Sequence, residues 1–186
     1  MRRIKDFQTI STCKVVQTGQ NQCIPASMEV VLRFTNLSKN WDQDGIVRRL
    51  AEGRRGMFQG SDFREVVACL REVFKKDGID IKRWDESYGN FQIWKKKVKG
   101  LVDRDIPPII TLYDPERVEA HALVVVGYDA EGIEVYDTGD GAVKYLVFHK
   151  LEEDSVWRGD ILELKKARKH RSLPRFFKKL RRIIKK

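Results

Sequence analysis

Apolar residues in the first half of the chain recur at the three- and four-residue spacing of amphipathic helices. A strong pattern covers 63–74, with apolar side chains on one face at Phe63, Val66, Val67, Leu70, Val73 and Phe74. Further helices are predicted at about 25–33, 44–51 and 90–103. Pro25 suits the first turn of its helix, where a missing N–H costs nothing.

The second half changes character. Short segments rich in β-branched and aromatic residues predict strands, separated by turn residues, at 106–113, 121–129, 132–137, 142–148 and 159–165. The sequence DAEG at 129–132 predicts a hairpin turn between two of them. Helices followed by strands indicate an α+β fold, with the helical half packed on an antiparallel sheet.

Composition narrows the class of protein. The chain has 186 residues, 41% hydrophobic and 34% charged, which favours one globular domain with a sizeable core. Its three cysteines do not form a disulfide framework, and neither they nor the histidines have zinc-ligand spacing. No signal peptide and no apolar run of about 18 residues is present, so we expect a cytoplasmic protein.

The net charge of +10 comes from the end of the chain. Residues 165–186 hold 12 Lys or Arg and no acidic residue, which leaves 37 − 12 = 25 basic and 27 acidic residues, a net −2, in 1–164. Apolar residues in this tail follow helical spacing at Leu173, Phe176, Phe177, Leu180, Ile183 and Ile184. The sequence therefore predicts a nearly neutral globular body, 1–164, and a basic amphipathic tail helix at 165–186.

Four polar residues with the chemistry of acyl transfer stand beside these elements. Cys23 directly precedes the apolar helix, where free N–H groups and the helix dipole favour a nucleophilic thiolate. His121 begins one strand and Asp137 ends the next, which suits a base and the group that orients it. Gln17, six residues before Cys23, suits a donor to an oxyanion.

Rivals for three of these roles remain open in the sequence. Gln20 and Gln22 lie closer to the cysteine and are alternative oxyanion donors. His149 is the alternative base. Asp140 is the alternative orienting carboxylate.

His121 and Asp137 can meet only if the hairpin between them is irregular. With a two-residue turn at 130–131 they are about three positions out of step, roughly 10 Å along a strand, and point to opposite faces. A bulge moves the facing by one residue. We therefore predict an odd-length loop or a bulge, and a regular ladder would exclude Asp137 from the site.

The pattern Q-x5-C-x-P-A-S, an apolar helix, HALVVVGYD and a strand ending in aspartate resembles papain-like cysteine peptidases. It is most similar to the bacteriocin-processing (double-glycine leader) peptidases, over about 12–165. The resemblance implies a papain-like fold with the cysteine on the central helix, no cofactor or metal, and a peptide or protein substrate. Carried over by position, the nucleophile, base, orienting residue and oxyanion donor are Cys23, His121, Asp137 and Gln17. Ile24 and Thr138 depart from the family's usual glycine and proline.

Three hypotheses for function follow. The first is a thiol peptidase that cleaves a peptide or isopeptide bond through an acyl-enzyme. The second keeps the site but performs deamidation or transglutaminase-like acyl transfer. The third is a non-enzymatic binding protein whose basic tail, 165–186, binds an anionic membrane or nucleic acid. Binding to a membrane through this tail would make the protein a peripheral membrane protein.

Overall fold

The computed structural model describes residues 1–19, 22–53, 63–84, 90–114, 119–154, 156–157 and 160–167. Its helices are α1 (Phe7–Ser11), α2 (Cys23–Phe34), α3 (Gln43–Gly53), α4 (Phe63–Lys75), α5 (Phe91–Val102) and α6 (Phe148–Glu153). Its strands are β1 (Arg2–Arg3), β2 (Ile79–Trp84), β3 (Ile109–Asp114), β4 (Glu119–Tyr128), β5 (Gly132–Asp137), β6 (Ala142–Val147) and β7 (Ile161–Lys166). The predicted α+β class is confirmed.

The strands form one sheet in the order β2-β7-β3-β4-β5-β6, with β1 added beside β4, and each described pairing is antiparallel. All five strands predicted in the second half are present. β2 was not predicted; it comes from the helical half and pairs with β7. Its segment IDIKRW alternates buried Ile79 and Ile81 with exposed Asp80 and Lys82, the period-two pattern of a strand with one face buried.

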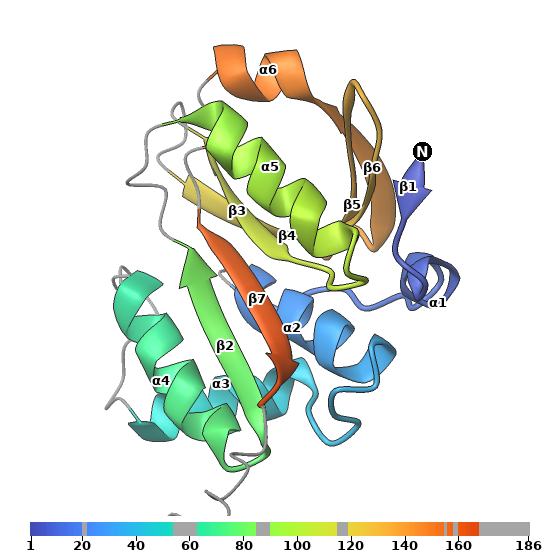
Figure 1. Ribbon diagram of the computed structural model, residues 1–186. Helices are drawn as coiled ribbons and strands as arrows, with labels where there is room; N and C mark the ends of the chain where they lie inside the picture. The colour runs from blue at the N-terminus through green and yellow to red at the C-terminus, as the bar shows by residue number, and fades with distance from the viewer. Residues whose placement is uncertain are drawn as a thin grey trace, which may run out of the picture.

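The helices cover the sheet on both sides. α5 crosses β3 and β4 at the front of Figure 1, and α2 packs against β4 from behind, while α4 packs against β2 in the lower half. β4 is buried continuously from Ala122 to Val126 because side chains on both of its faces meet a helix. α2 begins at Cys23, two residues before the predicted start, which leaves Pro25 in the first turn.

An aromatic cluster joins α5 to the end of the sheet. The Phe91 ring lies 5.6 Å from Trp94, 6.1 Å from Phe148 and 5.6 Å from Trp157, measured between ring centroids. Asn90 caps α5 by accepting hydrogen bonds from two backbone N–H groups of its first turn. Trp94 and Trp157 are buried and pack against the Phe91 ring.

The C-terminal part of the chain is described only to residue 167. β7 continues to Lys166, and the Ala167 N–H donates to the Gly78 carbonyl. Of the predicted tail helix at 165–186, Lys165 and Lys166 instead belong to β7, and 168–186 lie outside the described residues. Among the residues that are described, no helix is long and apolar enough to cross a membrane.

Candidate active site

Cys23 is the first residue of α2, at the positive end of the helix dipole. Its side chain is half-buried and free of any disulfide. The following residues, from Pro25 to Leu32, are all buried, which fixes the helix firmly in the core. Ser27 also donates a hydrogen bond of 3.3 Å to the Ala122 carbonyl on β4. This contact holds the cysteine helix against the strand that carries His121.

The hairpin that links the two other candidates is irregular, as predicted. A register shift lies between Val125 and Gly127 in the pairing of β4 with β5. The pair Tyr128–Ile133 lies before the shift, and its continuation as a regular ladder would place Asp137 opposite Val124. The bulge instead places Asp137 opposite Leu123.

This one-residue change decides whether the pair can form. Directly opposed residues share a face of the sheet, and so do residues two apart on one strand. Asp137 therefore lies on the same face as Leu123 and His121, as a diagonal neighbour of the histidine. The structure brings them together: His121 Nε2 lies 2.7 Å from Asp137 Oδ1.

Asp137 is held by more than His121. Its Oδ1 also accepts the Gly139 N–H at 2.7 Å, and its Oδ2 accepts Lys144 Nζ at 2.6 Å. Burial acts to raise the pKa of Asp137, but the hydrogen bonds from Lys144, His121 and Gly139 outweigh it, so the net pKa is lowered. The carboxylate is therefore ionised at neutral pH and accepts all three donors.

Lys144 was not recognised from the sequence. It lies on β6, whose residue Ala142 is paired with Asp137, so Lys144 is the diagonal neighbour on the same face. It also forms an ion pair of 2.7 Å with Asp140. The sequence does place Lys144 close to Asp137 and Asp140, across a hairpin turn. Only the register of β5 with β6 shows that the Lys144 side chain lies on the same face as Asp137.

His121 is strongly biased toward its charged form. The hydrogen bond with Cys23 is the largest cause, burial opposes it, and the hydrogen bond and charge of Asp137 add to it, which together raise the pKa of His121 to about 9. The side chain is 41% exposed, so it is open to solvent or substrate on one side. An imidazolium beside the thiol favours the thiolate that nucleophilic attack requires.

Gln17 lies in the loop before α2 and is tied to the strand end that carries Asp137. Its backbone N–H donates to the Thr138 carbonyl at 2.8 Å. Its side-chain Oε1 is buried and has no hydrogen-bond partner among the described residues. A buried polar atom without a partner costs roughly 1–3 kcal/mol.

The rival residues are placed differently. Gln22 is occupied, because its Oε1 accepts a hydrogen bond of 2.7 Å from the Thr18 hydroxyl, and Gln20 lies outside the described residues. His149 is exposed on α6, which follows the end of β6 opposite to Asp137. Asp140 is engaged by Lys144 and by the Ala142 N–H.

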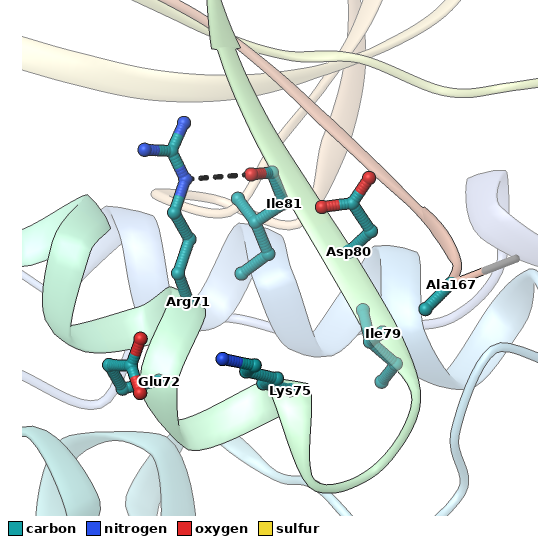
Figure 2. Close-up of a pocket in the computed structure, with 7 residues that line it drawn as sticks. All are labelled: Arg71, Glu72, Lys75, Ile79, Asp80, Ile81 and Ala167. Carbon is teal, nitrogen blue, oxygen red and sulfur yellow. Dashed lines mark hydrogen bonds between the residues drawn. The ribbon is translucent and has the colours of Figure 1, made fainter. Parts of the chain in front are cut away.

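Away from Cys23, a ligand could bind to a group of metal-ligating side chains or in a hollow of the surface. In the part of the chain that the structure describes, no group of three or more His, Cys, Asp or Glu side chains could hold a metal ion. A hollow of about 300 Å³ lies between α4 and β2, where Arg71 donates to the Ile81 carbonyl (Figure 2). Its lining mixes Arg71 and Lys75 with Glu72 and Asp80, and none of the four catalytic candidates contributes to it.

Similarities to known proteins appear both in a protein family and among solved structures. The model of the Peptidase_C39 like family matches residues 8–159. The peptidase domain of Streptococcus ComA, a bifunctional ABC transporter involved in a quorum sensing pathway, is similar with a TM-score of 0.55 and 17% identity, covering 89% of this chain and 99% of that one. The Pseudomonas avirulence protein AvrPphB has a TM-score of 0.44 and 10% identity, covering 81% and 94%. No curated protein sequence matches the chain significantly.

The family match extends over most of the chain and includes Cys23, His121 and Asp137. The likeness to the ComA domain confirms the papain-like α+β fold. The chain therefore belongs to the Peptidase_C39 like family and is a cysteine peptidase.

Proposed function

We propose that this cysteine peptidase hydrolyses a peptide or isopeptide bond with Cys23 as nucleophile, His121 as base, Asp137 as orienting carboxylate and Gln17 as oxyanion donor. The observation that carries the proposal is the contact of His121 Nε2 with Asp137 Oδ1 at 2.7 Å, on a histidine that also hydrogen-bonds Cys23. With Nε2 directed at the carboxylate, Nδ1 is the ring nitrogen left for the thiol. A single imidazole then links the nucleophile to the orienting group.

The first half of the reaction forms a thioester. The Cys23 thiolate attacks the carbonyl carbon, and the carbonyl oxygen becomes an oxyanion that accepts hydrogen bonds from the Gln17 amide and the Cys23 backbone N–H. The His121 imidazolium gives its proton to the leaving nitrogen as the C–N bond breaks. The amine product departs, and the acyl group stays on Cys23.

The second half releases the acid. His121, now neutral, takes a proton from a water molecule whose oxygen attacks the thioester carbon. The C–S bond breaks, the carboxylic acid leaves, and the proton returns the site to its thiolate–imidazolium state. Asp137, held by Lys144 and Gly139, keeps the ring orientation constant through both halves.

The nature of the products tests this assignment. We expect incubation with a mixture of peptides to give two fragments whose masses sum to that of the substrate plus one water. Deamidation instead raises the mass of an intact peptide by about one dalton, and transfer to an added amine gives a joined product. Either of these, with no fragmentation of any peptide or protein substrate, would refute peptide hydrolysis while leaving the thioester chemistry in place.

The basic tail supports a second, separate proposal. Twelve Lys or Arg and no acidic residue in 165–186, with apolar residues at helical spacing, favour binding to an anionic membrane surface, where each basic residue contributes about 1 kcal/mol. We expect the full chain to sediment with vesicles that contain anionic lipid at 50 mM salt, and less at 300 mM. Neutral vesicles are the control. Equal sedimentation with both, or binding to nucleic acid only, would contradict the proposal.

A further inference from the structure

The buried side chain of Gln43, at the start of α3, makes two hydrogen bonds that straddle Gln17. Gln43 Nε2 donates to the Val16 carbonyl at 2.9 Å, and Gln43 Oε1 accepts from the Thr18 N–H at 3.1 Å. Both ends of one amide are therefore used on the residues directly before and after the proposed oxyanion donor. The amide group fixes the backbone of the loop on one side.

The sheet fixes the same loop on the other side. The Tyr136 hydroxyl donates to the Val15 carbonyl at 3.0 Å, and the Gln17 N–H donates to the Thr138 carbonyl at 2.8 Å. Tyr136 and Thr138 are the two neighbours of Asp137 at the end of β5. The backbone groups of four consecutive residues, 15–18, are thus each hydrogen-bonded, either to the end of β5 that carries Asp137 or to Gln43 of α3.

Gln43 is itself held by the cysteine helix. Its backbone N–H donates to Glu29 Oε2 at 2.8 Å, and Glu29 lies on α2, six residues after Cys23. Glu29 is only 5% exposed and forms an ion pair with Arg33 one turn later. A buried carboxylate of α2 therefore sets the position of Gln43, and Gln43 sets the position of the loop.

These contacts can control the distance between the Gln17 amide and Cys23, on which stabilisation of an oxyanion depends. An oxyanion donor works only when it lies about 2.7–3.1 Å from the place where negative charge develops, and an error of about 1 Å can cost roughly 100-fold in rate. Gln17 lies in a loop without regular secondary structure, so its distance from Cys23 is not fixed by a helix or strand. Gln43 can fix this distance, because it is hydrogen-bonded both to the Gln17 loop and to the helix that begins at Cys23.

We propose that Gln43 is a positioning residue for the oxyanion site, which acts by holding the Gln17 amide at a fixed distance from Cys23. The inference rests on the proposed function, since it needs Gln17 to act on an oxyanion. It assigns Gln43 no contact with the substrate.

The test compares two reactions of Cys23 in the full chain. Alkylation by iodoacetamide forms no oxyanion and reports only on the thiolate and His121, whereas peptide hydrolysis needs the oxyanion site. Gln43→Leu keeps the size of the side chain and the backbone bond to Glu29 but removes both bonds to the loop. We expect kcat for hydrolysis to fall roughly 10- to 100-fold, with KM nearly constant. The alkylation rate should stay within about twofold.

A double variant shows whether Gln43 acts through Gln17. If it does, adding Gln43→Leu to Gln17→Ala should lower kcat by less than about threefold beyond Gln17→Ala alone, because the positioned amide is already absent. Gln92→Leu, the same change at an exposed glutamine of α5, is the matched control and should leave both reactions unchanged. If Gln43→Leu does not fold, Gln43→Glu replaces it, since it keeps the acceptor for the Thr18 N–H and loses the donor to Val16.

The outcomes separate the two proposals. Equal losses in alkylation and hydrolysis would show a merely structural role and overturn the inference, as would fully additive losses in the double variant. Both of these leave the wild-type peptidase intact. Failure of the wild-type protein to form a thioester or hydrolyse any peptide overturns the proposed function, and the inference falls with it.

Discussion

Replacing Cys23 with serine is expected to lower kcat/KM for peptide hydrolysis by roughly 10⁴-fold or more. A serine hydroxyl is far less acidic than a thiol, so neither the N-terminus of α2 nor His121 can ionise it in the resting enzyme. The substitution replaces one sulfur atom with oxygen at a half-buried position and should leave the fold unchanged. The measurement is the rate of product formation, together with the mass of protein treated with an electrophilic peptide probe, which should show no adduct.

Cys69→Ser is the matched control for this experiment. Cys69 is also half-buried and unpaired, but it lies on α4, which packs on β2 away from the His121 strand. Its variant should hydrolyse peptide and bind the probe like the wild type. Full hydrolysis by Cys23→Ser, or an adduct that remains in it and disappears in Cys69→Ser, would show that Cys23 is not the nucleophile.

Replacing His121 with alanine is expected to lower kcat/KM by roughly 10²- to 10⁴-fold, the usual contribution of general acid–base catalysis. Two effects combine: the leaving nitrogen has no proton donor, and the thiolate of Cys23 loses the neighbouring positive charge. Alkylation by iodoacetamide at neutral pH should therefore fall as well, unlike in Gln43→Leu. His149→Ala, on the exposed face of α6, is the control, and a larger loss there than in His121→Ala would reverse the assignment.

The pH dependence gives an independent check on His121. Its pKa of about 9 means that the ring is charged at neutral pH and loses its proton as the pH rises through about 9. Acylation needs this proton, so kcat/KM should decline as the pH rises through about 9. Asp137→Asn removes a charge that raises the His121 pKa, so the decline should move to lower pH. A decline at the same pH in Asp137→Asn would contradict the role of the carboxylate.

Much of this architecture follows from local patterns in the sequence. The amphipathic spacing of 63–74 and the β-branched runs of the second half predicted their elements because each has one period and a clear buried face. The bulge was predicted by a different argument. A regular hairpin would keep His121 and Asp137 apart, so their pairing required an irregularity, and the register shift between Val125 and Gly127 confirms it.

What escaped the sequence analysis depends on contacts between distant segments. β2 is only six residues long and its partner, β7, lies about eighty residues later, so its short alternation of apolar and polar residues is too brief to identify a strand by itself. Lys144 reaches Asp137 only through the β5–β6 register, and Gln43 reaches Val16, in the Gln17 loop, across 27 positions. Single hydrogen bonds of this kind leave no periodic signal along the chain.

The bulge of β4 also determines which parts of the hairpin can change length. Deleting one residue at the bulge, beside Val126, would restore a regular ladder between β4 and β5. His121 and Asp137 would then lie on opposite faces of the sheet, although neither residue had been changed. The tip at 130–131 lies beyond the last described pair, Tyr128–Ile133, so longer tips can be accommodated without disturbing the register. A change in tip length therefore leaves His121 and Asp137 in place, whereas any insertion or deletion between the bulge and His121 moves the two side chains relative to each other.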